Sequence, residues 1–152
     1  MTVPVFAAAK RICERSGWSL SNLGLQKLLY IIHMSYLGNH DEPLIQGHFE
    51  AWDYGPVQPD LYHKAKIFGS SPVGNIFHSD EKLGDCAETS MIDDVVAQLS
   101  NATPGRLVAI THWEGGAWHK NYIHGGRGSV IPNEDILQEY RDRQGIVANK
   151  KT

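Results

Sequence analysis

One long apolar stripe, within residues 21–39, constrains the fold more than any other part of the chain. Large apolar side chains recur there at spacings of three and four residues, at Leu25, Leu28, Leu29, Ile32 and Tyr36. Ser21 or Asn22 is a suitable cap at its start, and Gly38 with Asn39 is a common C-terminal stop. Because the stripe is wide and wholly apolar, it predicts a helix that forms the spine of a hydrophobic core.

Shorter patterns predict further elements around this helix. We expect helices at about residues 4–15, 58–68, 88–99 and 105–112, and a last helix capped by Asn133. Residues 44–52 hold two short apolar runs split by Gly47, which is typical of a strand or small hairpin that Gly55-Pro56 would end. Residues 69–87 are rich in Gly, Ser, Pro and Asp and predict a long connection, with one brief strand at 75–78.

These elements together predict a mainly α (α+β) fold. We expect a compact bundle of about six helices with a small β-hairpin element. At 152 residues the chain has the length of one domain, and we see no internal repeat or linker. We therefore expect a single domain over residues 1–145 and a frayed C-terminal tail over residues 146–152.

The composition argues against several classes of protein. The formal net charge is −3 with eight histidines counted as neutral, so the chain lacks the basic footprint of a nucleic-acid-binding protein. The longest apolar run, around residue 30, is interrupted by His33 and is too short and polar to span a bilayer. Cys13 and Cys86 have no C-x-x-C spacing and are typical of reduced thiols. We therefore expect a cytoplasmic protein with no membrane partner and no cofactor.

Four residues in the last third of the chain are candidate metal ligands, namely His112, Glu114, His119 and His124. A small metal-dependent hydrolase with Glu114 as general base is therefore the alternative function. Metal sites on helices use ligands three or four residues apart, and no pair of these histidines has that spacing. We therefore predict no metal site here.

No other group in the sequence is a strong catalytic candidate. Cys13 falls on a helix face that should pack, and acidic neighbours such as Asp85 disfavour a reactive thiolate at Cys86. The chain has no G-x-G-x-x-G motif and no Walker loop, and the G-G-R-G-S run at 125–129 favours a turn over an anion cradle. We predict no catalytic residue and no enzymatic activity.

The segment A-W-D-Y-G-P-V-Q-P-D-L-Y, residues 51–62, combines three aromatic residues and two prolines with little charge. One interpretation is structural, because a strand that turns into a helix can pack its rings back on itself. Rigid aromatic turns also supply large contact area at low entropic cost, as protein-binding hot spots do. Both interpretations stay open on physical grounds.

Residues 20–66 resemble the Panacea domain family of SocA-like and GepA-like phage-associated proteins. The family pattern is an L-Q-K-L-L-Y helix followed by E-A-W-x-Y-G-P-V-x-P-x-x-Y, which this chain matches at 25–30 and 50–62. A second family block, T-H-x-E-x-x-P-W, is similar to residues 111–118. Two residues depart from the pattern. Gly24 stands where the family often has lysine, and Ala117 stands where the family has proline.

The resemblance implies an antitoxin of a bacterial or prophage toxin–antitoxin system, which binds and neutralises a cognate protein toxin encoded by an adjacent gene. The SocA branch of the family acts as an adaptor that delivers its toxin to a Clp-type protease. We hypothesise protein-binding roles for Trp52, Tyr54, Pro56, Val57, Tyr62, His112, Glu114 and Trp118. These residues can equally hold the fold together, with toxin choice made by residues 69–87. A DNA-binding regulator is a third class, which the acidic charge balance argues against.

Overall fold

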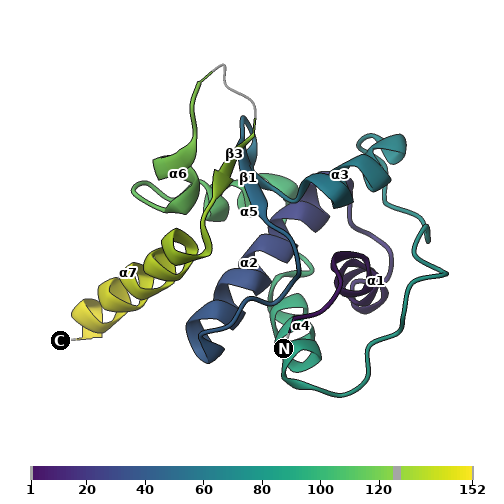
Figure 1. Cartoon of the computed structure of the whole chain (residues 1–152), viewed down its shortest axis with the longest axis horizontal. Coiled ribbons are helices and arrows are strands. Elements are labelled where there is room, and N and C mark those ends of the chain that lie inside the picture. The colour runs from purple at the N-terminus through teal and green to yellow at the C-terminus, as the bar shows by residue number, and fades with distance from the viewer. Residues whose placement is uncertain (1, 125–127, 152) are drawn as a thin grey trace.

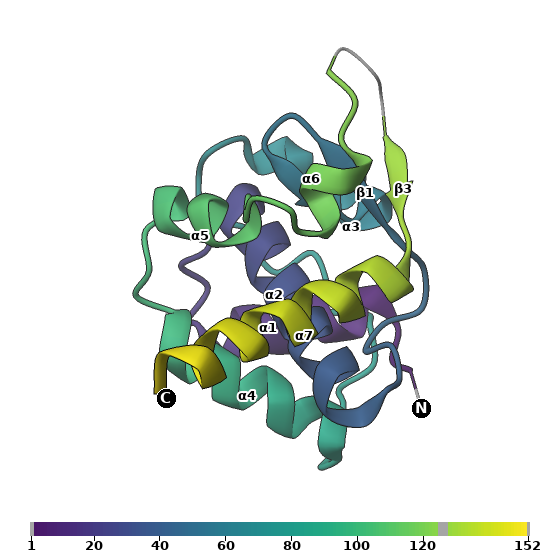
Figure 2. The same cartoon turned by 90° about the vertical axis from the view of Figure 1, so that its left-hand side faces the viewer.

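The long apolar helix lies at the centre of the molecule. The computed structural model of the chain describes residues 2–124 and 128–151, with side chains described up to position 145. Helix α2 (Asn22–His40) packs against α1 (Val5–Arg15), α4 (Ala87–Leu99), α5 (Pro104–Thr111) and α7 (Asn133–Lys151). Figures 1 and 2 show α2 among these helices, with α7 crossing its face. The prediction that this segment forms the spine of the core is confirmed.

Helix α2 begins with the cap that the sequence predicts, but the stop predicted at Gly38 and Asn39 is wrong, because both residues lie inside the helix. The Ser21 hydroxyl accepts a hydrogen bond from the Gly24 amide, and Asp41 ends the helix in the left-handed conformation, with φ of 57°. The helix is buried on nearly all sides, so that Gln26, Lys27 and His33 are buried together with the apolar stripe. Buried polar groups need partners, and the partners of these three residues shape the rest of the fold.

A small antiparallel sheet lies beside α2. It consists of β1 (Phe49–Trp52), β2 (Gly55–Val57) and β3 (Ser129–Ile131), in the order β2-β1-β3. Trp52 is opposite Gly55 across the first pair of strands, and Phe49 is opposite Ile131 across the second. The ring of Phe49 meets Tyr30 of α2 edge to face, with centroids 5.1 Å apart. The sheet thereby holds the hairpin against the N-terminal half of α2.

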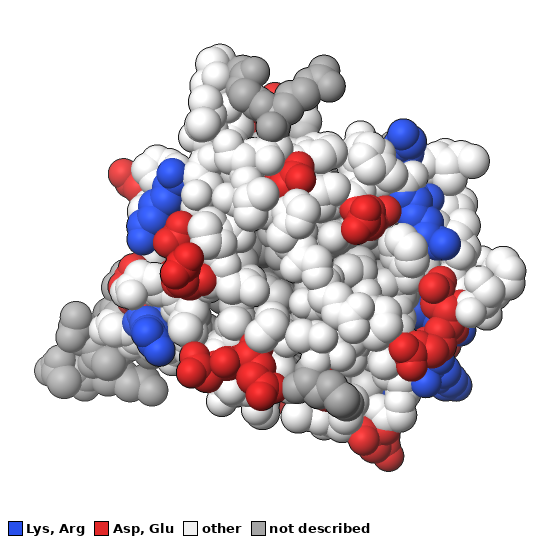
Figure 3. Space-filling model, viewed as in Figure 1, with Lys and Arg blue, Asp and Glu red and all other residues white. Residues whose placement is uncertain are grey.

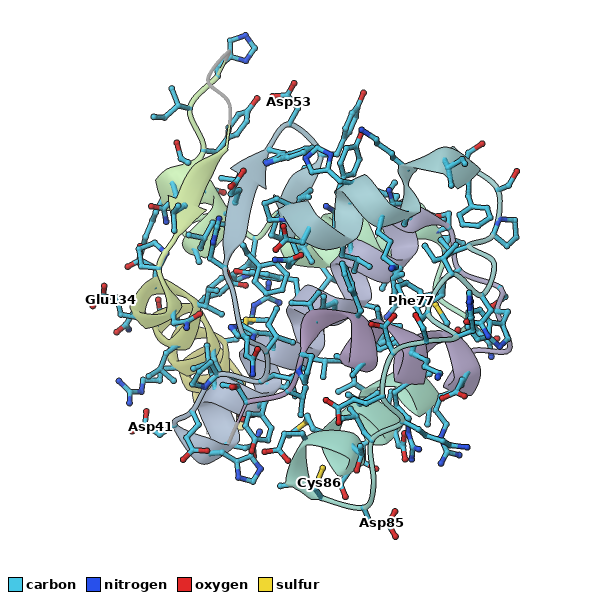
Figure 4. The ribbon with its side chains drawn as sticks, turned by 45° about the vertical axis from the view of Figure 1, so that its right-hand side comes forward. Asp41, Asp53, Phe77, Asp85, Cys86 and Glu134 are labelled. Atoms are coloured by element: carbon cyan, nitrogen blue, oxygen red, sulfur yellow. The ribbon has the colours of Figure 1, made fainter. Side chains whose placement is uncertain are left out.

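The remaining elements cover this core. Helix α3 (Pro59–Ala65) is capped by the Gln58 side chain and continues as the 3₁₀-helix η1 (Lys66–Phe68), and α6 (Ala117–Asn121) precedes β3. The connection between η1 and α4 is fastened by Phe77, which is fully buried and lies 6.2 Å from the ring of Phe6 in α1 (Figure 4). Val73 and Phe77 thus anchor this long segment to the core, while most of its other residues are exposed or partly exposed.

The predicted mainly α fold with a small β element is confirmed, but several details differ. The described residues form seven α-helices rather than six, because the short α6 adds one. The hairpin spans residues 49–57 rather than 44–52, since Gly55 and Pro56 begin the second strand instead of ending the first. The strand predicted at 75–78 is absent from these described residues, and β3 was not predicted.

The C-terminal helix also extends further than expected. The helical backbone of α7 continues past Gly145 to Lys151, through the segment predicted to be a frayed tail. The division into a domain over 1–145 and a tail over 146–152 stays a prediction.

Replacing Gly24 by alanine is expected to raise the free energy of unfolding by about 0.5–1 kcal/mol, because glycine is a poor residue inside a helix. An added Cβ would meet Leu20 and Ser21 at 3.6 Å and Leu107 at 4.0 Å, which are ordinary contacts. Urea denaturation of the variant and the parent chain measures the difference.

Gly38→Ala in the same helix is the matched control. A Cβ at Gly38 would overlap the ring of Tyr140 from α7, so we expect this variant to lose about 1–3 kcal/mol. Equal changes in the two variants would show that helix propensity and the α2–α7 packing do not act as described.

Candidate functional site

The turn between β1 and β2 stands out at one end of the molecule. Asp53 and Tyr54 are exposed at its tip, and Tyr54 is 72% exposed. Figure 4 shows Asp53 at this end of the molecule, pointing away from its body. Gly55 has φ of 113°, and a Cβ at this position would meet the side chains of His112 at 2.9 Å and Lys27 at 3.1 Å. The turn therefore requires glycine at this position.

Three aromatic rings hold this turn, and we call them the ring clamp: His112, Trp118 and Tyr122. The rings of His112 and Trp118 are parallel with centroids 4.0 Å apart, and Tyr122 stacks on Trp118 at 4.7 Å. The indole N–H of Trp118 donates to the carbonyl of Trp52 at 2.7 Å, and the hydroxyl of Tyr122 donates to the Asp53 carboxylate at 2.6 Å. The clamp thus fixes two successive residues of the turn.

The environment of the ring clamp changes the proton affinity of its members. Burial lowers the pKa of His112, a backbone hydrogen bond with Tyr54 opposes this shift, and the charge of Lys27 adds to it. The hydrogen bond to Asp53 raises the pKa of Tyr122. At pH 7 the His112 ring is therefore neutral, and it acts as a flat packing surface rather than as a charged contact.

Two consecutive residues of α2 hold the second strand of the hairpin. The side-chain amide of Gln26 accepts from the Gln58 backbone N–H at 2.7 Å and donates to the Gln58 carbonyl at 3.2 Å. The amine of Lys27 donates to the carbonyl of Pro56 at 2.8 Å. These bonds satisfy the backbone of β2 on the side that has no neighbouring strand.

A pocket of about 710 Å³ opens between α2, the β1–β2 turn and α3, and we call it the turn pocket. It is lined by Asn22, Leu23, Gln26, Lys27, Glu50, Trp52, Asp53, Tyr54, Val57, Tyr62, His63, Lys66, Gly69 and Gly128. Trp52 and Tyr62 meet edge to face on its wall, with centroids 4.8 Å apart. Its size and its mixture of aromatic and polar groups suit a small ligand or a few inserted side chains.

The charged side chains that line the turn pocket differ in whether they have a partner of opposite charge or a hydrogen-bond donor. Lys27 is 0% exposed, and burial lowers the pKa of its amine to about 7. Among the residues with described side chains, no ion pair includes Lys27. The two carboxylates of the pocket do have partners: Glu50 accepts from Trp52 at 3.0 Å and pairs with His48 at 2.9 Å, and Asp53 accepts from Tyr122.

The residues predicted for protein binding fall into groups that the structure separates. Those that line the turn pocket are Trp52, Tyr54, Val57 and Tyr62. Pro56 is buried in β2, and Glu114 is exposed between α5 and α6. His112 and Trp118 belong to the ring clamp, where they position the turn.

Three residues of this site had no assigned role in the sequence. Gln26 and Lys27 lie inside the matched family pattern, and their polarity within an apolar stripe was the available signal. Tyr122 carried no such signal, because its partner Asp53 is 69 positions away in the chain.

The candidate metal ligands do not converge. Among the residues that the structure describes, no group of three or more His, Cys, Asp or Glu side chains could hold a metal ion. His112 is stacked in the ring clamp, and Nδ1 of His119 accepts a hydrogen bond from the Gly115 amide at 3.0 Å. The hydrolase alternative gains no support from this arrangement.

The two cysteines lie away from the turn. Cys13 is buried in α1, and burial raises the pKa of its thiol to about 12. Cys86 precedes α4, and Figure 4 shows it at the opposite end of the molecule from Asp53. The G-G-R-G-S run is described only in part, since residues 125–127 lie outside the described residues.

The helices and the surface agree with what the composition indicates about membrane-spanning and nucleic-acid-binding proteins. In the described part of the chain no helix has the length and apolar character needed to cross a membrane. Figure 3 shows one face of the molecule, where the basic side chains lie in small separate groups near the edge, with acidic side chains among them. This face offers no continuous basic surface for a phosphate backbone.

Comparison with known families places the chain. Residues 25–119 match the family described as Antitoxin SocA-like, Panacea domain, and the chain belongs to this family, as the resemblance indicated. The match runs from α2 through the hairpin to the first residues of α6, so that it includes Lys27, Trp52, His112 and Trp118.

One curated relative is the protein named Antitoxin SocA from Caulobacter vibrioides (strain NA1000 / CB15N). It is 34% identical to this chain over 124 residues, which cover 74% of this chain and 64% of the relative. The similarity thus spans less than two thirds of the relative's own length. No solved structure gives a significant match.

Proposed function

We propose that this chain is an antitoxin that binds and neutralises a protein toxin without carrying out a chemical reaction. The observation that carries the proposal is the clamped turn, which presents Tyr54 beside the turn pocket on a rigid support. Membership of the Antitoxin SocA-like, Panacea domain family supports an antitoxin role, and so does the relative named Antitoxin SocA. The toxin and the mode of neutralisation are our proposals.

Neutralisation proceeds by masking in this proposal. Tyr54 is exposed, Trp52 and Tyr62 are partly exposed, and the three side chains line one pocket. A stable interface buries about 800 Å² on each partner, and a few central aromatic residues supply most of its binding energy. Because the ring clamp already holds the turn, little conformational entropy is lost when a toxin binds.

The first test is co-expression of this chain with the product of the adjacent gene, which we propose to be the toxin. We expect the adjacent product alone to stop growth, and this chain to restore growth and to co-purify with it. A harmless adjacent product that does not co-purify would overturn the proposal.

Tyr54→Ala is expected to weaken the complex about 30-fold or more, which corresponds to about 2 kcal/mol for a central aromatic residue. The fold should be unaffected, because Tyr54 is 72% exposed. Isothermal titration with the purified toxin measures the affinity, and thermal unfolding of the free chain checks the fold.

Asp94→Ala is the control for this measurement. Asp94 is exposed on α4, which lies at the other end of the molecule from the hairpin (Figure 1). We expect no change in affinity for this variant. If Tyr54→Ala bound as tightly as Asp94→Ala, the turn would not be the interface, and residues 69–87 would become the next candidate.

Delivery of the toxin to a Clp-type protease is the other mode of neutralisation for the same bound complex. The half-life of the toxin in cells separates the two modes, because masking leaves the bound toxin intact whereas delivery shortens its life. We expect a long-lived toxin in the presence of this chain. Rapid loss of the toxin that depends on the protease would favour delivery.

A further inference from the structure

We propose that the turn pocket recognises a carboxylate side chain of the partner protein, with Lys27 as its buried counter-ion. The inference rests on the proposed function, and it adds which chemical group of the toxin the antitoxin recognises. The occupant is an acidic residue, Asp or Glu, within an inserted segment of the toxin.

Lys27 is the first reason for this assignment. Its side chain is fully buried at the base of the pocket, and its amine makes one described hydrogen bond, to the carbonyl of Pro56. An ammonium group has three N–H donors, and a buried charge without a counter-ion is costly. In this proposal a carboxylate that enters the pocket supplies the negative charge and accepts a second hydrogen bond from the Lys27 amine.

The carboxylates already present do not fulfil this role. Both oxygens of Glu50 are engaged, by the Trp52 indole and by His48, and Asp53 is engaged by Tyr122. The imidazole of His112 also faces Lys27 across Gly55, and it is kept neutral by burial. The Lys27 amine therefore has no carboxylate partner within the described part of the chain.

The outer part of the pocket favours a peptide segment as the occupant. Lys66 lies on its α3 side and adds positive charge where an acidic segment would approach. Leu23 and Tyr54 are exposed apolar groups beside the same opening. The side-chain oxygen of Asn22 is buried without a hydrogen-bond partner among the described residues, and the backbone N–H of an inserted segment fits it. A simple carboxylate ion such as acetate lacks such a donor.

The test follows the proton on Lys27 directly. The chain is labelled with ¹³C at the ε-carbon of lysine, and NMR titration gives the pKa of Lys27 in the free chain and in the complex with the adjacent gene product. We expect binding to raise this pKa by at least one unit, a tenfold gain in proton affinity, because the carboxylate stabilises the charged amine. A complex that forms with the Lys27 pKa unchanged would overturn the inference and leave the antitoxin function standing.

Two capped peptides, Ac-Leu-Glu-Leu-NH₂ and Ac-Leu-Gln-Leu-NH₂, provide a probe that does not depend on the toxin. We expect the glutamate peptide to shift the Lys27 signal saturably and to bind at least tenfold tighter than the glutamine peptide. If no toxin complex forms, this result supports carboxylate recognition although the proposed function has failed. Equal binding of the two peptides, or binding of neither, would in that case overturn the inference as well.

Substitutions supply the third line of evidence. Lys27→Met is expected to weaken the toxin complex at least tenfold, and Lys66→Met about twofold to fivefold, mainly through slower association, since Lys66 is exposed. Circular dichroism establishes that each variant is folded. If Lys27→Met does not fold, the NMR titration of the unmodified chain decides the question. A folded Lys27→Met variant that binds the toxin with unchanged affinity would contradict the assignment.

Discussion

Replacing Glu139 by alanine is expected to lower the free energy of unfolding by about 3 kcal/mol or more. Glu139 is 1% exposed and connects three parts of the fold. One carboxylate oxygen accepts from the Ala117 amide at 2.8 Å, and the other pairs with Arg143 at 2.7 Å. The Arg143 guanidinium also donates to the carbonyl of Ile110 and lies over the ring of Trp113.

The expected size of this effect follows from what the substitution leaves behind. Removing one partner of a buried ion pair typically costs about 3–5 kcal/mol, because the other charge and its donors lose their acceptor. The Arg143 side chain is 24% exposed and can reach water, which places the loss at the lower end of that range. Because Ala117 begins α6, the variant should also loosen the segment that supplies Trp118 to the ring clamp.

Urea denaturation of three variants tests this expectation. Glu139→Gln keeps one acceptor for the Ala117 amide and should lose less stability than Glu139→Ala. Glu134→Ala removes an exposed glutamate from the first turn of the same helix and should cost about 1 kcal/mol or less. Similar losses for Glu139→Ala and Glu134→Ala would show that the buried carboxylate is not a structural connection.

The second large effect is a loss of stability on acidification that arises from His33. This residue of α2 is 0% exposed, and burial lowers the pKa of its imidazole to about 4. One ring nitrogen contacts the side-chain oxygen of Asn133 at 2.9 Å, and the other has no partner among the described residues. The ring also packs against Phe49, with centroids 5.1 Å apart.

The direction of the pH dependence follows from the difference between the pKa of His33 in the folded chain and its pKa in the unfolded chain. The pKa of an unfolded histidine is about 6.5, so between pH 6.5 and 4 the unfolded chain binds a proton at His33 and the folded chain does not. The stabilising contribution of His33 is complete above pH 6.5 and declines as the pH falls toward 4. At about 1.4 kcal/mol per pH unit, the loss over this range is about 3 kcal/mol.

His33→Gln separates this residue from the other titrating groups. Its amide can still donate to Asn133 but does not titrate, so we expect the variant to lose about 3 kcal/mol less than the parent chain between pH 6.5 and 4. The same substitution at the exposed His124 is the control for removing a histidine from the surface of the chain. Parallel profiles for the parent chain and His33→Gln would contradict a neutral buried imidazole.

The helices were predictable because their signals are local. Ser21 caps α2, and the Thr103 hydroxyl caps α5 by accepting from the Arg106 amide. Each signal acts within one helical turn, so neighbouring residues in the sequence are sufficient to see it. Strand β3 has three residues and exists through its pairing with β1, far away in the chain, which explains why no local pattern predicted it.

The sequence located the aromatic turn of the candidate site, but it did not show the residues that hold the turn in place. The aromatic turn was visible as a run of rings and prolines around Trp52 and Tyr54. That Tyr122 binds Asp53 depends on α6 being placed beside the hairpin, and Glu139 of α7 helps to place it. Contacts of this kind join segments that have no common pattern, so only the folded chain shows them.

The sequence by itself determined the helical spine, its N-terminal cap, the mainly α class and the family, because these depend on periodicity and on residues close together in the chain. The tertiary structure alone decided which face of the hairpin is supported and which is open. It also placed Lys27, which any sequence pattern would assign to the surface of a helix, in the buried lining of the turn pocket, with no ion pair to any side chain that the structure describes. The physical reason is that burial and charge pairing are properties of the whole packed molecule, and helix α2 is enclosed by elements from every part of the chain.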